Sequence, residues 1–184
     1  RIGWGNCLRA GWLNKRRVLD KAFYPLMVER YMALALPEKE VPEVESFRPK
    51  LIVDADLVEK AVAKYDLDIQ RPVLILCPGA QFGETKRWPE EYFAKLVDHY
   101  KQEGWSVWLL GGPGEKELVA NINKLAKVAA IDLTQTSLAE AVDLLSLASV
   151  VVSNDSGLMH IACALAKPLV AIFGSTSPGH TPPL

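Results

Sequence analysis

Residues 72–91, PVLILCPGAQFGETKRWPEE, contain a short apolar run, a polar loop and the beginning of a helix. Val73–Cys77 is apolar without interruption, which is typical of a strand buried on both faces of a sheet. Pro89 fits a first helical position, and Glu90 and Glu91 follow it in the first turn, where negative charge complements the helix dipole. This stretch predicts one strand–loop–helix unit of an α/β protein.

Short apolar runs and helical patterns continue to alternate through the rest of the chain. Further strands are expected at 106–110, 128–133, 149–153 and 169–173, and further helices at 115–126, 137–147 and 157–166. Ser137 and Glu140 fit a capping box at the start of one helix, and Gly104 fits the stop of the first. Strands that alternate with helices form a parallel sheet with right-handed crossovers and helices on both faces. The expected fold class is therefore α/β, with a Rossmann-like parallel sheet.

The N-terminal residues follow a different pattern. Helices are expected at 14–21, 25–36 and 57–65, and a strand-like run at 51–53. Residues 1–50 contain ten lysines and arginines against six acids, whereas residues 51–184 contain eleven against sixteen. Uneven charge indicates parts with different roles, although solvated helix faces also produce it. We therefore expect the two parts of the chain to have different functions.

The composition excludes several classes of protein. Of the 184 residues, 49% are hydrophobic and 23% are charged, and the formal net charge is −1, which excludes a disordered or collagen-like chain. No apolar run reaches the roughly 18 residues that span a bilayer. Cys7, Cys77 and Cys163 are odd in number and lack CxxC spacing, so we expect thiols in a reducing compartment rather than disulfides or a metal site.

The ends of the chain and its charged residues narrow the interpretation further. Arg1 stands where an initiator methionine would, and the chain ends shortly after the last expected strand, so we expect a piece of a longer protein. Histidines, cysteines and carboxylates show no metal-ligand spacing. Nucleic-acid binding is not expected, because the second domain is acidic and has no stripe of basic and aromatic residues.

The loop after the first strand of the sheet domain is the first candidate binding segment. Ligands of open α/β sheets bind beyond the carboxyl ends of the strands. Thr85, Lys86 and backbone N–H groups before the next helix form a candidate phosphate site. Glu84 and Thr85 separate Gly83 from Lys86, so the loop is not a Walker A motif. The alternative is a mobile surface loop whose Trp88 packs on the helix.

The loop after the second strand contains Gly111, Gly112, Pro113, Gly114 and Glu115. A dinucleotide-binding fingerprint is excluded, because the position that would need the third glycine is occupied by glutamate. An acid at the end of a second strand accepts hydrogen bonds from ribose hydroxyls, and Glu115 has this position. The alternative is an acid favoured only by the helix dipole.

The third candidate segment follows the fourth strand of the sheet domain. Asp155 or Ser156 fits a helix cap, and Gly157 allows a phosphate to approach the helix N-terminus closely. His160 falls in the same turn, where a packed structural histidine is the alternative. Three loops with phosphate-binding and ribose-binding features at one sheet edge predict a nucleotide ligand.

Several segments together resemble the heptosyltransferases of lipopolysaccharide core synthesis in Gram-negative bacteria. These segments are 78–80, 86–89, 111–115, 153–160 and 173–178, with further similarity at 13–15, 19–21 and 25–31. The similarity covers nearly the whole chain, and it is the combination of segments that makes it specific.

The resemblance implies a two-domain GT-B glycosyltransferase of family 9 that needs no cofactor. Residues 1–66 would be the end of the acceptor-binding N-terminal domain with the linker, and residues 67–184 the nucleotide-sugar-binding domain, truncated at its C-terminus. The donor would be ADP-L-glycero-β-D-manno-heptose. The residues expected to bind it are Thr85, Lys86, Glu115, Asp155, Ser156, Gly157, Leu158 and His160.

The resemblance also implies a role for each of these residues. Lys86 would contact the diphosphate and stabilise the leaving ADP, and Glu115 would bind the ribose. Asp155 would bind the heptose or its phosphate. The N–H groups of residues 156–158 would hold phosphate, and His160 would complete the pocket.

The implied reaction is inverting transfer of heptose to the inner core, with heptosyl-Kdo2-lipid A as acceptor. In the family the general base is an aspartate near the N-terminus of the whole protein, upstream of Arg1, so we expect a donor-binding fragment that does not transfer sugar. The enzyme would be cytoplasmic and meet its acceptor at the inner face of the inner membrane. Arg9, Lys15, Arg16 and Arg17 would attract the phosphates and carboxylates of the acceptor.

Two other functions remain open from the sequence. One is another nucleotide-sugar enzyme of similar architecture, such as a heptosyltransferase I or III or an epimerase. The other is a non-catalytic α/β module, which has no need of Lys86, Glu115 and Asp155 at the same sheet edge.

Overall fold

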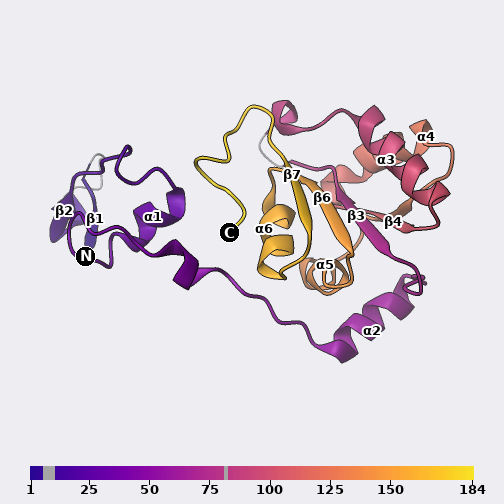
Figure 1. The fold of residues 1–184 in the computed structure, drawn as a ribbon, viewed down its shortest axis with the longest axis horizontal. Helices are drawn as coiled ribbons and strands as arrows, with labels where there is room; N and C mark the ends of the chain where they lie inside the picture. Colours follow the sequence, from indigo (N-terminus) through magenta and orange to yellow (C-terminus); the bar gives the residue numbers. More distant parts are fainter. Residues whose placement is uncertain (6–10, 81–82) are drawn as a thin grey trace. The chain divides into compact units, whose positions relative to one another are not determined.

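The computed structural model describes residues 1–5, 11–80 and 83–184, so Cys7 and Arg9 lie outside the described residues. The chain divides into two compact units (Figure 1), here called the N-terminal unit and the sheet unit. The N-terminal unit comprises Arg1–Arg48 and Ser177–Pro182, and the sheet unit comprises Pro49–Thr176 and Pro183–Leu184. The sheet unit thus begins before residue 67, the boundary expected from the sequence.

The sheet unit is built on a five-stranded sheet whose strands are all parallel. The strands are β3 (Val73–Cys77), β4 (Ser106–Leu110), β5 (Ile131–Leu133), β6 (Val150–Asn154) and β7 (Leu169–Ile172), in the order β5-β4-β3-β6-β7. The central strand β3 pairs with β4 on one side and with β6 on the other. Strands β4 and β5 are thus added on one side of β3, and β6 and β7 on the other. This reversal of the strand order at β3 and β6 confirms the expected Rossmann-like arrangement.

Helices cover both faces of this sheet, as Figure 1 shows. The helices are α2 (Ala55–Lys64), α3 (Glu90–Gln102), α4 (Lys116–Leu125), α5 (Leu138–Leu145) and α6 (Gly157–Ala164). Leu74 and Leu76 of β3 belong to the core under α3 and α4, whereas Ile75 and Cys77 belong to the core with α2, α5 and α6. Because successive residues of a strand point to opposite faces, a strand between two helical layers is apolar at every position.

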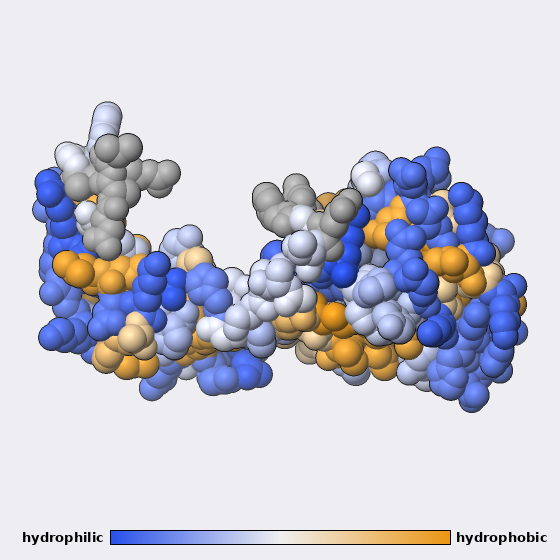
Figure 2. Space-filling model, turned by 90° about the horizontal axis from the view of Figure 1, so that it is seen from above, coloured by the Kyte–Doolittle hydropathy of each residue, from blue (hydrophilic) through white to orange (hydrophobic). Residues whose placement is uncertain are grey.

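The helices present polar residues to the solvent. The surface of the sheet unit seen in Figure 2 is mostly hydrophilic, with separate hydrophobic patches. Cys77 is a free, buried cysteine, and its burial raises the pKa of the thiol and keeps it protonated. Within the described ranges, no helix is long and apolar enough to cross a membrane.

Local details differ from the sequence-based expectations at several element ends. Pro89 is the N-cap of α3 rather than its first helical residue. A 3-10 turn, η4 (Pro113–Glu115), precedes α4, so the α-helix begins at Lys116. β5 begins at Ile131 instead of residue 128, and Val128 is exposed.

The N-terminal unit contains a small two-stranded parallel sheet, the short helix α1 (Met27–Met32) and a 3-10 turn at Val44–Phe47. The helix expected at 14–21 is wrong, because β2 (Lys15–Arg17) pairs with β1 (Ile2–Trp4). The buried Arg17 guanidinium donates a hydrogen bond to the Ala33 carbonyl. Tertiary contacts of this kind override helical propensity in a short segment.

Burial of Arg17 also corrects the charge hypothesis for this segment. Its side chain is 7% exposed, so it is not available to attract an acceptor, whereas Lys15 and Arg16 are exposed. Residues 51–53, expected to be strand-like, are not in a strand. Leu51 N–H instead donates to the Ala164 carbonyl within the sheet unit.

Glu140 joins α2 to α5 and so brings α2 into the sheet unit. Its carboxylate accepts from Lys64 Nζ at 2.5 Å and from the Tyr65 hydroxyl at 3.2 Å. It also accepts from Ser137 N–H at 2.8 Å and completes the predicted capping box. The hydrogen bond from Lys64, followed by those from Ser137, lowers the pKa of Glu140 to about 2.

The low pKa of Glu140 predicts an acid-sensitive contribution to stability. A carboxyl whose pKa is lowered on folding stabilises the fold above its unfolded-state pKa, and this contribution is lost as pH falls toward about 2. Glu140→Gln should therefore reduce the free energy of unfolding at pH 7 and have little effect at pH 2. Chemical denaturation at both pH values measures the difference. Glu117→Gln, at an exposed position of α4, is the control, and an equal pH dependence in both variants would contradict the role of Glu140.

Candidate functional site

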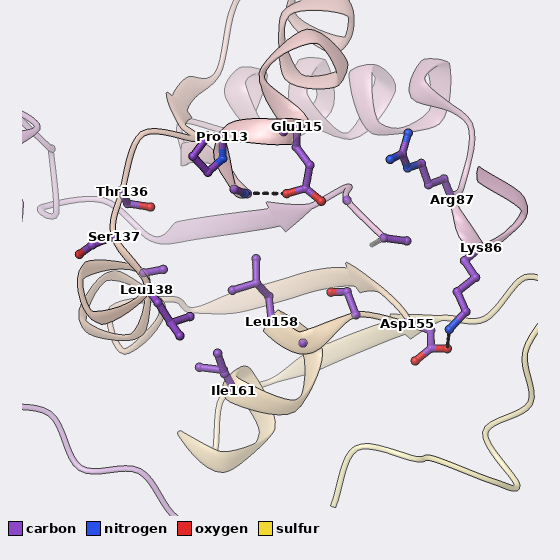
Figure 3. Close-up of a pocket in the computed structure, with 18 residues that line it drawn as sticks. Lys86, Arg87, Pro113, Glu115, Thr136, Ser137, Leu138, Asp155, Leu158 and Ile161 are labelled. Carbon is purple, nitrogen blue, oxygen red and sulfur yellow. Dashed lines mark hydrogen bonds and ion pairs between the residues drawn. The ribbon is translucent and has the colours of Figure 1, made fainter. Parts of the chain in front are cut away.

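A cavity of about 660 Å³ lies at the carboxyl-terminal edge of the sheet (Figure 3). Four segments line it: Gly79, Ala80, Lys86 and Arg87 after β3; Gly111–Glu115 after β4; Thr136–Leu138 and Ala141 at α5; and Asp155–Leu158 and Ile161 at α6. Each segment follows a different strand of the parallel sheet, so the strand order brings them to one edge. All three loops predicted from the sequence therefore reach the same cavity.

The side chain of Asn154 holds both ends of the loop after β3. This residue ends β6 and is fully buried. Its Nδ2 donates to the Pro78 carbonyl at 2.7 Å, and its Oδ1 accepts from Trp88 N–H at 3.1 Å. Because a buried amide is costly without partners, these bonds fix where the loop leaves β3 and where it reaches α3. Sequence analysis did not single out Asn154, and a pairing across 66 positions in the chain leaves no local signal.

Trp88 itself has a packing role. Its ring stacks on Tyr92 with centroids 5.0 Å apart and meets Phe93 edge-on at 5.2 Å. The alternative considered for Trp88, a tryptophan that packs on the helix, is thus the observed arrangement. The two basic residues that precede it, Lys86 and Arg87, line the cavity.

Lys86 and Asp155 form an ion pair at one end of the cavity. Lys86 Nζ lies 2.8 Å from Asp155 Oδ2, and the Asp155 side chain is 8% exposed. Burial by itself would raise the pKa of Asp155, but the hydrogen bond from Lys86 and the positive charge of Lys86 hold this pKa below its usual value. Asp155 is therefore a carboxylate at neutral pH, and its charge is balanced by Lys86.

The N-terminus of α6 opens onto the cavity beside this pair. Ser156 occupies the N-cap position, as one of the two alternatives from the sequence had it, but its side chain makes no capping hydrogen bond. A Cβ atom at Gly157 would meet nothing within 4 Å. The first N–H groups of a helix have no partner within the helix and bind anions readily. Ser156, Gly157 and Leu158 all line the cavity, as predicted.

The carboxylate of Glu115 lies against the glycines of the two neighbouring loops. Its Oε2 accepts from Gly112 N–H at 2.6 Å (Figure 3). Its Oε1 lies 1.4 Å from the place where a Cβ of Gly79 would be, and its Oε2 lies 2.5 Å from that of Gly111. Any side chain at Gly79 or Gly111 would displace this carboxylate, so Glu115 keeps this position only because both neighbours are glycines.

Two residues expected in the site lie outside the cavity lining. Thr85 is exposed, and its Oγ1 is 3.1 Å from Ser175 Oγ, a contact that supports the loop before Lys86. His160 is exposed on α6, and its side chain does not line the cavity.

Arg87 and the start of α5 line the cavity, although sequence analysis did not assign them to the site. The only sequence signal for a role of Arg87 in the site was its position next to Lys86 in the first candidate loop. Thr136, Ser137 and Leu138 follow a strand end that carries no glycine or charge pattern. Among the described residues, no group of histidines, cysteines and carboxylates is arranged to hold a metal ion.

The arrangement suits an elongated ligand with a phosphate group. Lys86 and the N-terminus of α6 lie near Asp155. The carboxylate of Glu115, which is suited to bind hydroxyls, lies beside Gly79, Gly111 and Gly112 in another part of the same cavity wall. A nucleoside diphosphate has phosphates and ribose hydroxyls in such an order.

The comparisons with known proteins agree with this chemistry. The model of the family described as Glycosyltransferase family 9 (heptosyltransferase) matches residues 1–184. Lipopolysaccharide heptosyltransferase 2 of Salmonella typhimurium is 40% identical over 195 residues, an alignment that covers 100% of this chain and 56% of the relative. The enzyme of the same name from Escherichia coli is also 40% identical, with the same coverage. The chain therefore spans just over half the length of these relatives.

Solved structures show the same similarity in three dimensions. The structure of E. coli ADP-heptose lps heptosyltransferase II superimposes with a TM-score of 0.88 at 39% identity, covering 100% of this chain and 59% of the other. E. coli heptosyltransferase WaaC with ADP, at 24% identity and a TM-score of 0.63 over 94% of this chain and 51% of the other, shares the fold. These matches confirm the expected GT-B fold class, and together with the family match they show that the chain belongs to glycosyltransferase family 9, the heptosyltransferase family.

Proposed function

We propose that this chain carries the donor-binding part of an inverting heptosyltransferase. The enzyme would transfer L-glycero-D-manno-heptose from ADP-heptose to the lipopolysaccharide inner core, with heptosyl-Kdo2-lipid A as acceptor. The observation that carries the proposal is the cavity in which Lys86, the N-terminus of α6 and Glu115 converge. The 40% identity with heptosyltransferase 2 enzymes supports the choice of donor and acceptor.

The donor would extend along the cavity from Glu115 to Asp155. The Glu115 carboxylate, held by Gly112 N–H, would accept hydrogen bonds from the ribose hydroxyls. The diphosphate would lie against Lys86 and the N–H groups of residues 156–158. Asp155 would then accept hydrogen bonds from the heptose hydroxyls, since the phosphate competes for Lys86.

The chemical step would break the bond between the anomeric carbon and the β-phosphate oxygen while the acceptor hydroxyl attacks from the opposite face. Negative charge grows on the β-phosphate as ADP leaves. Lys86 and the helix N-terminus would stabilise that charge, each by a few kcal/mol as typical for preorganised donors. The proton of the acceptor hydroxyl would pass to a general base. We assign neither Asp155 nor Glu115 to that role, since the heptose hydroxyls would engage the first and the ribose hydroxyls the second. We therefore propose that the chain by itself binds the donor without transferring sugar.

The acceptor would be drawn by positive charge on the N-terminal unit. Lys15 and Arg16 are exposed there, and the acceptor carries phosphates and Kdo carboxylates. The enzyme would work in the cytoplasm, at the inner face of the inner membrane.

Nucleotide preference separates this function from the second candidate, another nucleotide-sugar enzyme of the same architecture. Thermal unfolding with ADP-heptose, UDP-sugars and GDP-sugars should show stabilisation by the adenine nucleotide, because a ligand that binds only the folded state raises its stability. Stabilisation by a UDP-sugar or GDP-sugar instead would favour the second candidate. A chain that no nucleotide stabilises would be a non-catalytic module.

Lys86→Ala should weaken ADP binding by about 1–3 kcal/mol, as expected for loss of a charge-assisted contact. Calorimetry with ADP on the wild type and the variant measures the difference. Lys116→Ala removes the same charge from an exposed position outside the cavity lining and serves as the control. Equal affinities for wild type and Lys86→Ala would remove Lys86 from the site.

Gly79→Ala should weaken ADP binding by roughly tenfold, because its methyl group takes the place of the Glu115 carboxylate. Gly114→Ala in the same cavity wall should bind normally, since a Cβ there meets nothing within 4 Å. The effects of Gly79→Ala and Glu115→Ala should not add in the double variant, because both act on one carboxylate. Additive losses in calorimetry would show that Gly79 acts in another way.

A further inference from the structure

Arg87 and Lys86 are neighbours in the chain, but their side chains run in different directions along the cavity wall. Both residues line it. In Figure 3 the Lys86 side chain runs to Asp155, whereas Arg87 extends away from Asp155, on the side where Glu115 lies. The Asn154 bond to Trp88 N–H, immediately after Arg87, sets the backbone from which both side chains start.

The guanidinium of Arg87 has an unused donor in a buried place. Its Nε is buried and has no hydrogen-bond partner among the residues that the structure describes. An unpaired buried donor is unfavourable, and a guanidinium stays charged at any physiological pH. A ligand oxygen supplied from the cavity would remove this cost.

The charges around the cavity leave Arg87 as the available cation among the described lining residues. Lys86 is paired with Asp155 at 2.8 Å, and Glu115 is engaged by Gly112 N–H. No ion pair joins Arg87 to a carboxylate within the described parts of the chain. A guanidinium with free donors is well suited to a phosphate group, which accepts hydrogen bonds from two of its nitrogens.

We propose that Arg87 binds the phosphate next to the ribose, the α-phosphate of ADP, while Lys86 and α6 bind the terminal β-phosphate. The inference rests on the proposed function, because it takes the direction of the donor from Glu115 at the ribose to Asp155 at the sugar. Along that direction Arg87 lies on the ribose side and Lys86 on the sugar side. Arg87 therefore anchors the nucleotide, and Lys86 acts on the leaving-group oxygen.

This division of the diphosphate predicts different responses to ADP and AMP. Arg87→Gln should weaken AMP and ADP binding by similar factors, each about tenfold or more, because both nucleotides have the α-phosphate. Lys86→Gln should weaken ADP binding by such a factor and leave AMP binding nearly unchanged. Adenosine should bind wild type and both variants equally. NMR titration of the 184-residue chain with adenosine, AMP and ADP measures all three affinities.

Two further variants control the experiment. Arg71→Gln removes an arginine that pairs with Asp68 on the surface of the same unit, and it should bind all three ligands as the wild type does. Arg87→Lys keeps the charge and most of the aliphatic stem but loses the guanidinium, so it should weaken AMP by a smaller factor. It provides the result if Arg87→Gln is shown by thermal unfolding to be unstable.

The outcomes separate this inference from the proposed function. If wild type binds ADP, and AMP affinity is unchanged in both Arg87 variants, the α-phosphate assignment is overturned and the donor site stands. A loss in Arg87→Gln for ADP only would also overturn it, since Arg87 would then act on the β-phosphate. If wild type binds neither ADP nor AMP, the proposed function and this inference fail together.

Discussion

The site depends on the buried side-chain amide of Asn154. This one group donates to Pro78 at the end of β3 and accepts from Trp88 just before α3. A fully buried amide without partners would cost free energy, so the two bonds hold the loop between Pro78 and Trp88 against the end of β6. The positions of Lys86 and Arg87 follow from that attachment, because both lie just before its second anchor.

The order of the strands explains why this attachment falls at a binding site. β3 and β6 are neighbours in the sheet. Asn154, at the end of β6, can therefore bond to Trp88, in the loop that follows β3, although 66 positions separate the two residues in the chain. Their following loops diverge at this point, one toward α3 on one face and one toward α6 on the other, which leaves a crevice at the sheet edge. Lys86 and Asp155 face each other across that crevice, and a phosphate would compete with Asp155 for Lys86.

Much of the sheet unit was predictable because its signals are local. The uninterrupted apolar residues of β3 report burial on both faces, and the Ser137–Glu140 capping box reports a helix start. Segments stabilised by distant contacts were not predictable. Lys15–Arg17 is a strand only because it pairs with Ile2–Trp4. α2 joins the sheet unit through the burial of Ala61 in its core and through the contact of Lys64 with Glu140. Neither contact leaves a periodic pattern in the sequence.

The sequence by itself determined the alternation of strands and helices, the three loops at one sheet edge and the residues through which the chain resembles heptosyltransferases. These features arise from periodicity and spacing along the chain. The tertiary structure decided which side chains meet there: it placed Arg87 in the cavity wall and left Thr85 and His160 outside it. The direction of a side chain depends on bonds made across the sheet, such as those of Asn154. Sequence neighbours such as Lys86 and Arg87 can therefore point in different directions within one cavity.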